Sequence, residues 1–384
     1  MENELRNLCS LGNEANRANF AKRWKEDDKK VVGILCSYVP EEIIHASGML
    51  PWRIFGTWRA STPLAEEWRR PHMCLYCNHV LESLLSGELD FLDAVIATDW
   101  DQELVRLWDV WKYIDKTPYT FIIDVPIVNS ENAIRYFAKQ VELLCQSVEK
   151  MVRHRVSEEA LYHSITVYER TRSLIRHLYE LRKAEIPSLS GTELLGITTS
   201  ALLMPKEEFN RQLEALLPYI EQRKAKLNKN SPRLLVSSDR LDNPEYLKVV
   251  EESGCLVAMD DMDTGSRHFW CHVDTANISP RSTREELITC LARRYLMQPA
   301  SPRMMDWQEQ IWQVAEWVRE FNIQGVVELP QGYSRYREFR THFFKHSLEA
   351  EGIRMMSFRR EYHLAHTAQL KTRVGAFIEI LEAR

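Results

Sequence analysis

The sequence predicts an α/β protein built from two units, each with its own parallel β-sheet. Short apolar runs recur along the chain, helix-like segments separate them, and the alternation restarts after a polar stretch at 228–233. Strands that alternate with helices are typical of parallel sheets with crossover helices. A length of 384 residues also exceeds one ordinary core, which favours two or three domains.

The first α/β domain is predicted at residues 31–155, after an N-terminal helical segment at 1–30. Its opening stretch, 35–57, combines a strand end, a proline turn, a helix and a second strand. Pro40 followed by two acidic residues is typical of a helix start. The other expected elements of this domain are a strand at 31–35, strands at 94–97 and 120–123, and a helix at 102–113 between those two.

A helical connection is predicted at 156–230, and the second α/β domain at 231–384. Long helices rich in Leu, Glu, Arg and Lys begin near Asn132, and prolines interrupt the helical pattern after Ile186. The best linker is the stretch Asn228 to Arg233. The second domain is expected to contain strands at 233–238, 255–261, 325–329 and 353–358, with helices near 304–321, at 336–350 and at the C-terminus.

Composition narrows the class of protein. A net charge of −5 argues against nucleic-acid binding, which needs a basic surface. No run of 18 apolar residues and no charged-then-apolar leader occurs, so neither membrane insertion nor secretion is expected. Eight cysteines are scattered along the chain, and without a secretion signal they favour free thiols or metal ligands over disulfides. We therefore expect a cytoplasmic protein.

Polar side chains follow several of the predicted strands. Such stretches occur at 36–37, 98–102, 260–267 and 330–336. Binding sites in parallel sheets form at the carboxyl ends of strands, because loops and helix N-termini converge there. The sequence therefore predicts a site in the crevice between the two domains.

Two histidine-bearing motifs leave alternatives open. Cys74-x-x-Cys77 lies between His72 and His79, which suggests either a metal site or buried free thiols. His342 and His346 are one helical turn apart, but the glutamate of a zinc protease is missing. A solvated or capping pair is the simpler interpretation of these two histidines.

Two further stretches after strands are also ambiguous. "DDMDTGSR" after the strand at 255–261 is either a loop that caps the next element or a magnesium or substrate site. Ser37 is either a substrate-facing group or the cap of the helix that begins near Pro40. The tryptophans, Trp100 among them, are expected in cores and interfaces.

Taken together, several segments resemble the 2-hydroxyacyl-CoA dehydratase and benzoyl-CoA reductase family. The segments are "YVPEEIIHASGMLP", "CLYCNHVLESLLSGELDFLDAVIA", "VEESGCLVAMDDMDTGSRHF", "NIQGVVEL", "LEAEGI" and "QLKTRVGAFIEIL". They keep the family's order and cover nearly the whole chain.

The resemblance implies two flavodoxin-like or Rossmann-like α/β domains with additional helices. It also implies a heteromeric complex with a homologous cluster-bearing subunit, an ATP-dependent iron–sulfur activator and an acyl-CoA substrate. In that family three cysteines hold a 4Fe–4S cluster, and the activator supplies a low-potential electron that is used either for dehydration of a 2-hydroxyacyl-CoA or for reduction of an aromatic ring.

This chain departs from the family pattern at the cluster ligands. Only Cys74 matches a family cysteine; Trp100 and Asp101 stand in the region of the second, and Ser334 in that of the third. A cysteine often found in the second-domain loop is replaced by Asp263. Because iron–sulfur clusters require thiolates, the chain is expected to be the cluster-poor partner in the complex.

The candidate site residues follow from this resemblance. Ser37 is the candidate catalytic residue, as a donor to a thioester or carbonyl oxygen, with Tyr38 and Arg267 as further substrate-binding residues. Cys74, Asp101 and Ser334 are the candidate metal ligands. Two alternatives are a non-catalytic scaffold subunit, and a divergent member with a different metal bound by Asp99, Asp101 and Asp263, or with none.

Overall fold

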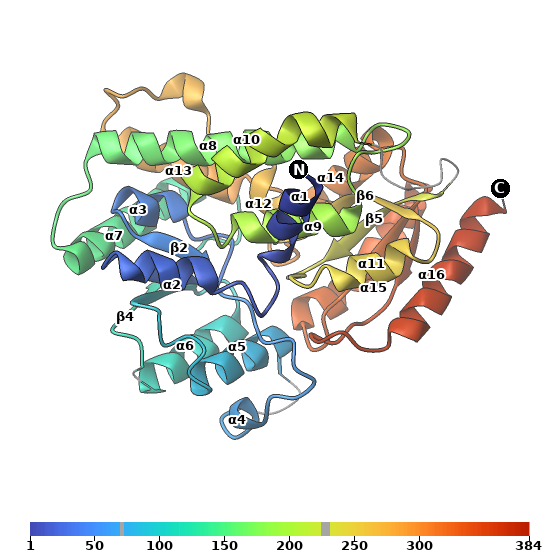
Figure 1. The fold of residues 1–384 in the computed structure, drawn as a ribbon, viewed down its shortest axis with the longest axis horizontal. Helices are drawn as coiled ribbons and strands as arrows, with labels where there is room; N and C mark the ends of the chain where they lie inside the picture. Colours follow the sequence, from blue (N-terminus) through green and yellow to red (C-terminus); the bar gives the residue numbers. More distant parts are fainter. Residues whose placement is uncertain (70–72, 115, 224–230, 384) are drawn as a thin grey trace.

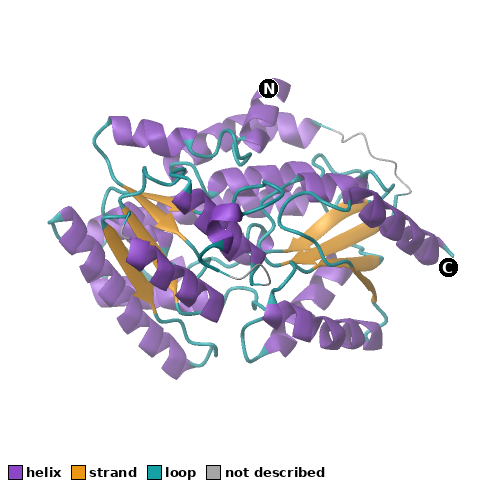
Figure 2. Cartoon of the chain, turned by 90° about the horizontal axis from the view of Figure 1, so that it is seen from below, coloured by secondary structure: helices purple, strands orange, loops and turns teal. Residues whose placement is uncertain are grey.

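The computed structural model describes residues 1–69, 73–114, 116–223 and 231–383, and it contains two four-stranded, all-parallel sheets (Figures 1 and 2). Both sheets carry helices on their faces. Six of the eight described strands are buried along their whole length, and one edge strand of each sheet, at 119–123 and at 354–357, is half-buried. The burial explains the continuous apolar runs, since a parallel sheet is covered on both sides. The predicted fold class is therefore confirmed.

The first sheet has the strand order β2-β1-β3-β4. Its strands are β1 (Val31–Ile34), β2 (Leu50–Arg53), β3 (Ala94–Thr98) and β4 (Tyr119–Ile123). The second sheet repeats this arrangement as β6-β5-β7-β8. Its strands are β5 (Arg233–Ser238), β6 (Leu256–Asp261), β7 (Gly325–Leu329) and β8 (Arg354–Ser357). This is the doubly wound order of flavodoxin-like folds, in which the chain reverses direction beside the first strand.

Helices connect the strands of each sheet. Those of the first are α3 (Glu41–Ala46), α4 (Pro63–Glu66), α5 (Leu75–Leu85) and α6 (Gln102–Ile114). Those of the second are α11 (Glu245–Glu251), α12 (Ser266–Phe269), α13 (Arg284–Leu296), α14 (Trp307–Glu320) and α15 (Arg335–Ala350), with a short 3-10 turn η1 (Thr275–Asn277) and the C-terminal α16 (Thr367–Glu382).

The remaining helices precede the first sheet or join the two sheets. They are α1 (Glu2–Ser10), α2 (Asn19–Glu26), α7 (Glu131–Val152), α8 (Glu158–Leu181), α9 (Gly191–Ala201) and α10 (Lys206–Gln222). Serine caps fix three of these starts: Ser130 and Ser157 accept from backbone N–H groups, and Ser190 forms a full capping box with Glu193. These caps explain why one long helical pattern breaks into separate helices.

The two sheets are tied together by helices that pack across them. Helix α13 comes from the second half of the chain but packs against α7 and α8. In Figure 1, α13 is drawn in orange behind the green helix α8. Helix α9 packs against α11 and β6. As a result, one hydrophobic cluster extends through residues of both sheets.

Most predicted elements are found within one to three residues of their expected ends. Helices α4, α5, α12 and α13 have no counterpart among the predicted elements, and the helix expected from Met304 begins at Trp307. Part of the expected linker, 228–230, lies outside the described residues. The division into domains at 31–155 and 231–384 stays a prediction.

No helix among the described residues is long and apolar enough to cross a membrane.

Candidate functional site

The segments that follow the strands of one sheet contact those that follow the strands of the other. Gln331, after β7, donates a hydrogen bond to the sulfur of Cys74 at 3.5 Å. Tyr362, after β8, donates to Asp242 at 2.9 Å and accepts from the Gly56 N–H at 2.9 Å. Trp58 also donates to Asp242, at 3.1 Å. The predicted meeting of polar strand ends is therefore present, and the candidate site lies there.

Ser37 and Tyr38 follow β1 and are buried in this region. The Tyr38 ring stacks on Trp100, which follows β3, with 4.3 Å between ring centroids. Burial raises the pKa of Tyr38, and its hydroxyl has no hydrogen bond of ordinary geometry to any described residue, although Gln298 lies beside it. Such an unsatisfied buried hydroxyl is available to a ligand.

The alternative that Ser37 caps the next helix is wrong. The N-cap of α3 is Pro40, and the hydroxyl that accepts from the first backbone N–H of this helix, that of Glu41, belongs to Tyr295, at 3.1 Å. Pro40 can occupy this position because the first N–H groups of a helix lack internal partners in any case. The Ser37 hydroxyl is therefore not explained by capping, and its role in substrate binding stays a prediction.

Cys74 and Cys77 lie together at the start of α5. Cys74 is the N-cap residue and Cys77 is in the first turn. Hydrogen bonding from the Cys77 thiol lowers the pKa of Cys74 to about 7, whereas burial holds the pKa of Cys77 well above its ordinary value. Both sulfurs are free in the structure. Cys74 is thus the more acidic thiol of the two.

A cavity of about 210 Å³ reaches Cys74 from the surface. Its lining includes Cys74, Asp101 and Arg303 together with the aromatic side chains of Tyr336 and Phe339. Asp101 and Arg303 form a buried ion pair at 2.5 Å. Asp101 also accepts from the Glu103 backbone N–H at 3.0 Å, so it caps the start of α6.

Arg267 and Ser334, two other predicted site residues, are already engaged by the protein. Arg267 forms ion pairs with Asp261 at 2.9 Å and with Asp263 at 3.0 Å, and donates to backbone carbonyls. Ser334 donates to Asp239 at 2.9 Å. Because these contacts are internal, both residues have structural tasks whether or not a ligand binds.

The donor set does not fit an iron–sulfur cluster. Of the three positions that resemble family ligands, Cys74 alone has a sulfur, the Trp100 indole is stacked on Tyr38, and both Asp101 oxygens have partners. No group of three or more His, Cys, Asp or Glu side chains that could hold a metal occurs within the described residues. The described residues at these positions therefore do not supply the three thiolates that the family's cluster requires.

Oxygen ligation by Asp99, Asp101 and Asp263 has no support either. Asp99 accepts from the Val125 N–H at 2.8 Å, and burial raises its pKa to about 6. Asp263 pairs with Arg267. Each carboxylate is held by a different protein partner, and the described residues place no three of these acids around one point.

The other motifs have structural explanations. The His79 ring stacks on Tyr362, and burial lowers its pKa to about 4. His342 and His346 are exposed on α15, and His72 lies outside the described residues. Near the end of β6, Asp260 accepts at 2.8 Å from the N–H of Ser266, the first residue of α12, which supports the capping interpretation of this stretch.

The main residue that the sequence did not reveal is Arg240, directly after β5. Its guanidinium is buried, lies over the Tyr76 ring at 4.3 Å, and is 4.0 Å from Asp263. Two of its nitrogens have no hydrogen-bond partner among the described residues. Its position after a strand was the one available signal, but nothing in the sequence distinguishes it from arginines that lie on the surface.

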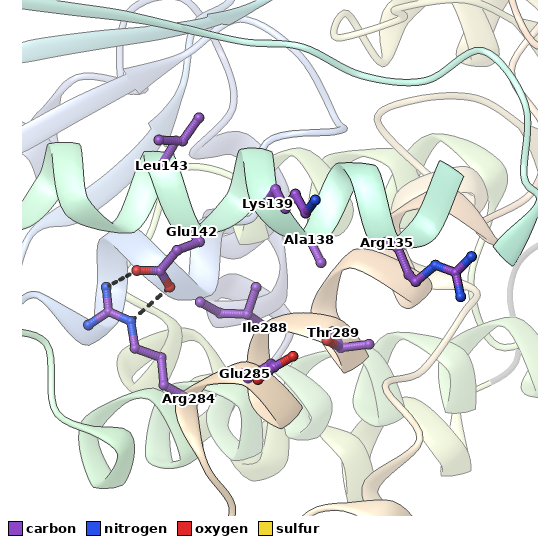
Figure 3. Close-up of a pocket in the computed structure, with 9 residues that line it drawn as sticks. All are labelled: Arg135, Ala138, Lys139, Glu142, Leu143, Arg284, Glu285, Ile288 and Thr289. Carbon is purple, nitrogen blue, oxygen red and sulfur yellow. Dashed lines mark hydrogen bonds and ion pairs between the residues drawn. The ribbon is translucent and has the colours of Figure 1, made fainter. Parts of the chain in front are cut away.

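A larger cavity, of about 690 Å³, lies between α7 and α13 (Figure 3). Figure 3 shows Arg284 of α13 reaching Glu142 of α7, with Nε to Oε2 at 2.9 Å. No cysteine, histidine or aromatic residue is among the described residues that line it. It is a packing groove between helices, and the strand ends provide the better candidate site.

The fold and the site define a class: a doubly wound α/β protein with two sheets whose strand ends enclose a buried, thiol-containing site. Comparison with known families is more specific. The model described as 2-hydroxyglutaryl-CoA dehydratase, D-component, matches residues 36–381. The chain belongs to this family, and the resemblance found in the sequence is confirmed.

Similar proteins are subunits of acyl-CoA enzymes. A benzoyl-CoA reductase subunit of Thauera aromatica is 28% identical over 67% of this chain and 68% of its own length. The (R)-phenyllactyl-CoA dehydratase beta subunit of Clostridium sporogenes is 22% identical over 94% of both chains. The beta subunit of (R)-2-hydroxyglutaryl-CoA dehydratase from Acidaminococcus fermentans is 25% identical over 66% of this chain and 68% of its own length.

Proposed function

We propose that this chain is the cluster-poor subunit of a cytoplasmic, heteromeric complex that acts on an acyl-CoA. The 4Fe–4S cluster belongs to a related subunit, and an ATP-dependent iron–sulfur activator supplies its low-potential electron. The names of the relatives support a subunit role. The observation that carries the proposal is the ligand set, in which Cys74 is accompanied by Trp100 and Ser334 where thiolates would be needed.

The first test measures iron and acid-labile sulfide on the chain purified without oxygen, alone and with its related subunit. We expect no iron on the isolated chain and about four irons per pair, the content of one 4Fe–4S cluster. Cys74→Ala in this chain should leave the iron content of the pair unchanged. About four irons on the isolated chain, lost in Cys74→Ala, would contradict the proposal.

Within the complex, we propose that Ser37 donates a hydrogen bond to the acyl carbonyl. Ser37→Ala should lower kcat/KM about tenfold, because one hydrogen bond contributes roughly 0.5–1.5 kcal/mol. The matched control is Ser47→Ala, at the other end of α3, where the hydroxyl donates to the Ile44 carbonyl. A normal rate in Ser37→Ala would favour the second candidate function, a scaffold subunit that leaves substrate binding to its partner.

One observation favours a close protein partner under either function. The aromatic rim, which we define as Tyr336, Phe339 and Phe343 of α15, is exposed by 39%, 77% and 58%. Two of its members line the cavity that leads to Cys74. Exposed aromatic clusters of this kind are typical of protein interfaces. We propose that the aromatic rim contacts the related subunit, so that the cavity opens toward it.

A charge in the aromatic rim should weaken the complex. We expect Phe339→Asp to raise the dissociation constant of the pair at least 30-fold, a loss of about 2 kcal/mol that is typical of a buried aromatic anchor. Isothermal titration calorimetry measures this change. Ile380→Asp serves as the control, because Ile380 is similarly exposed but lies on α16. Equal effects of both substitutions on the dissociation constant would show that the aromatic rim is not part of the interface.

A further inference from the structure

The backbone of α5 places two cysteines at disulfide-forming distance. The Asn78 N–H donates to the Cys74 carbonyl at 3.2 Å, so the helical turn that contains Cys77 begins at Cys74. Residues three apart in an α-helix have Cα atoms about 5 Å apart. Disulfides usually join Cα atoms at about 4.4–6.8 Å. The separation of their Cα atoms is therefore compatible with a disulfide.

The two thiols differ in access. Cys74 lines the 210 Å³ cavity, whereas Cys77 is fully buried behind it and does not line the cavity. A reactant that enters the cavity therefore meets Cys74 first. This is the arrangement of dithiol sites, in which one cysteine attacks and the buried one resolves the intermediate.

Groups from the second half of the chain lie around the sulfur of Cys74. Its sulfur accepts a hydrogen bond from the Gln331 amide at 3.5 Å and lies at the positive end of α5. Arg240 interacts electrostatically with the same sulfur, and two of its buried nitrogens have no hydrogen-bond partner among the described residues. These donors come from the second half of the chain, so the reactivity of Cys74 depends on both sheets.

We propose that Cys74 and Cys77 form a reversible dithiol–disulfide couple that exchanges with small disulfides entering the cavity. The Cys74 thiolate attacks one sulfur of the small disulfide, breaks its S–S bond and releases one thiolate, which leaves a mixed disulfide. Cys77 then gives up its proton and attacks the Cys74 sulfur, which releases the second thiol. The two cysteines lose two electrons in total, and the small disulfide gains them as two thiols.

This couple goes beyond the proposed function, since it does not require an acyl-CoA, a partner or a cluster. Oxidation would remove the thiolate that Gln331 and Arg240 face. Oxidation of the pair would thereby change the contact between Cys74 and Gln331, which joins the two halves, and the lining of the cavity beside the aromatic rim.

The test uses hydroxyethyl disulfide on the full chain, purified without oxygen and freed of reductant. After acid quenching, the protein is unfolded and alkylated, and its mass gives the number of free thiols. We expect two of the eight thiols to disappear without an adduct, peptide mapping to join residues 74 and 77, and dithiothreitol to restore both thiols.

Three variants make the test specific. Cys77→Ser should retain a stable hydroxyethyl adduct on Cys74, because the resolving thiol is gone, and Cys74→Ser should keep all its remaining thiols. Cys255→Ser, which removes a buried cysteine outside the pair, should still lose two thiols. Circular dichroism verifies that each variant folds.

Two results would overturn the couple. One is retention of all eight thiols by iron-free protein; the other is loss of thiols that map to other cysteines. Either leaves the iron assay of the proposed function unaffected. Conversely, iron bound through Cys74 that blocks its reaction would overturn both proposals, and the metal content identifies that case.

Discussion

Replacing Arg172 with methionine is expected to lower the free energy of unfolding by about 3–5 kcal/mol, because it leaves a buried carboxylate unpaired. Arg172 is buried on α8 and forms ion pairs with Glu42 of α3 and, at 2.5 Å, with Glu169. Glu42 is fully buried, and Arg172 lowers its pKa against the opposing effect of burial. Tyr295 of α13 donates to the same carboxylate at 2.8 Å.

Urea denaturation measures this loss, and the same helix offers a control. Arg170 forms an ion pair with Glu214, but both side chains are largely exposed. Arg170→Met should therefore cost less than about 1 kcal/mol. If both substitutions lowered the free energy of unfolding equally, the buried ion pair would not be a main stabilising contact between α3 and α8.

The second large effect is acid destabilisation through Glu169. Burial opposes ionisation of this carboxyl, but hydrogen bonding from His272 and the charge of Arg172 outweigh it and hold its pKa at about 2, below its ordinary 4.5. A lowered folded-state pKa stabilises the protein at pH values above 4.5, and this contribution is lost as the pH falls from 4.5 toward 2. The difference between this pKa and 4.5 corresponds to about 3 kcal/mol for this mostly buried group.

The expected result is a steep fall in the free energy of unfolding between pH 4.5 and pH 2.5, measured by urea denaturation. Glu169→Gln should be less stable at pH 7 and should show a shallower dependence on pH in this range. Glu316→Gln, which changes an exposed carboxyl on α14, should follow the wild-type curve. If the free energy of unfolding of Glu169→Gln fell with pH as steeply as that of the wild type, other carboxyls would be responsible for the acid sensitivity.

The sequence carries enough information for the fold because parallel strands are buried on both faces. Runs such as "RLLVSS" and "GVVEL" are therefore continuous, and they stand out between amphipathic helices. Helix α5 was missed because nine of its eleven residues are buried, which removes the polar face that helical periodicity needs. Helix α13, in contrast, begins at a capping box formed by Thr283 and Glu286, so its start is encoded in the local sequence.

The site was predicted less completely than the fold. Its location followed from the rule that strand ends converge, and Cys74 and Asp101 do lie on one cavity. The pairing of Asp101 with Arg303, and of Cys74 with Gln331, joins residues more than 200 positions apart. No local pattern encodes such contacts, because they depend on how the two sheets face each other.

The packing of α13 against α7 and α8 has a mechanical consequence. A protein of two sheets with a site between them often works as a hinge, opening for the ligand and closing around it. Here a helix from the second half is anchored in the helical layer of the first, and the buried contact from Tyr295 to Glu42 fastens it. We therefore expect access to the buried thiol to depend on side-chain motion at the cavity mouth rather than on a hinge movement of the two halves.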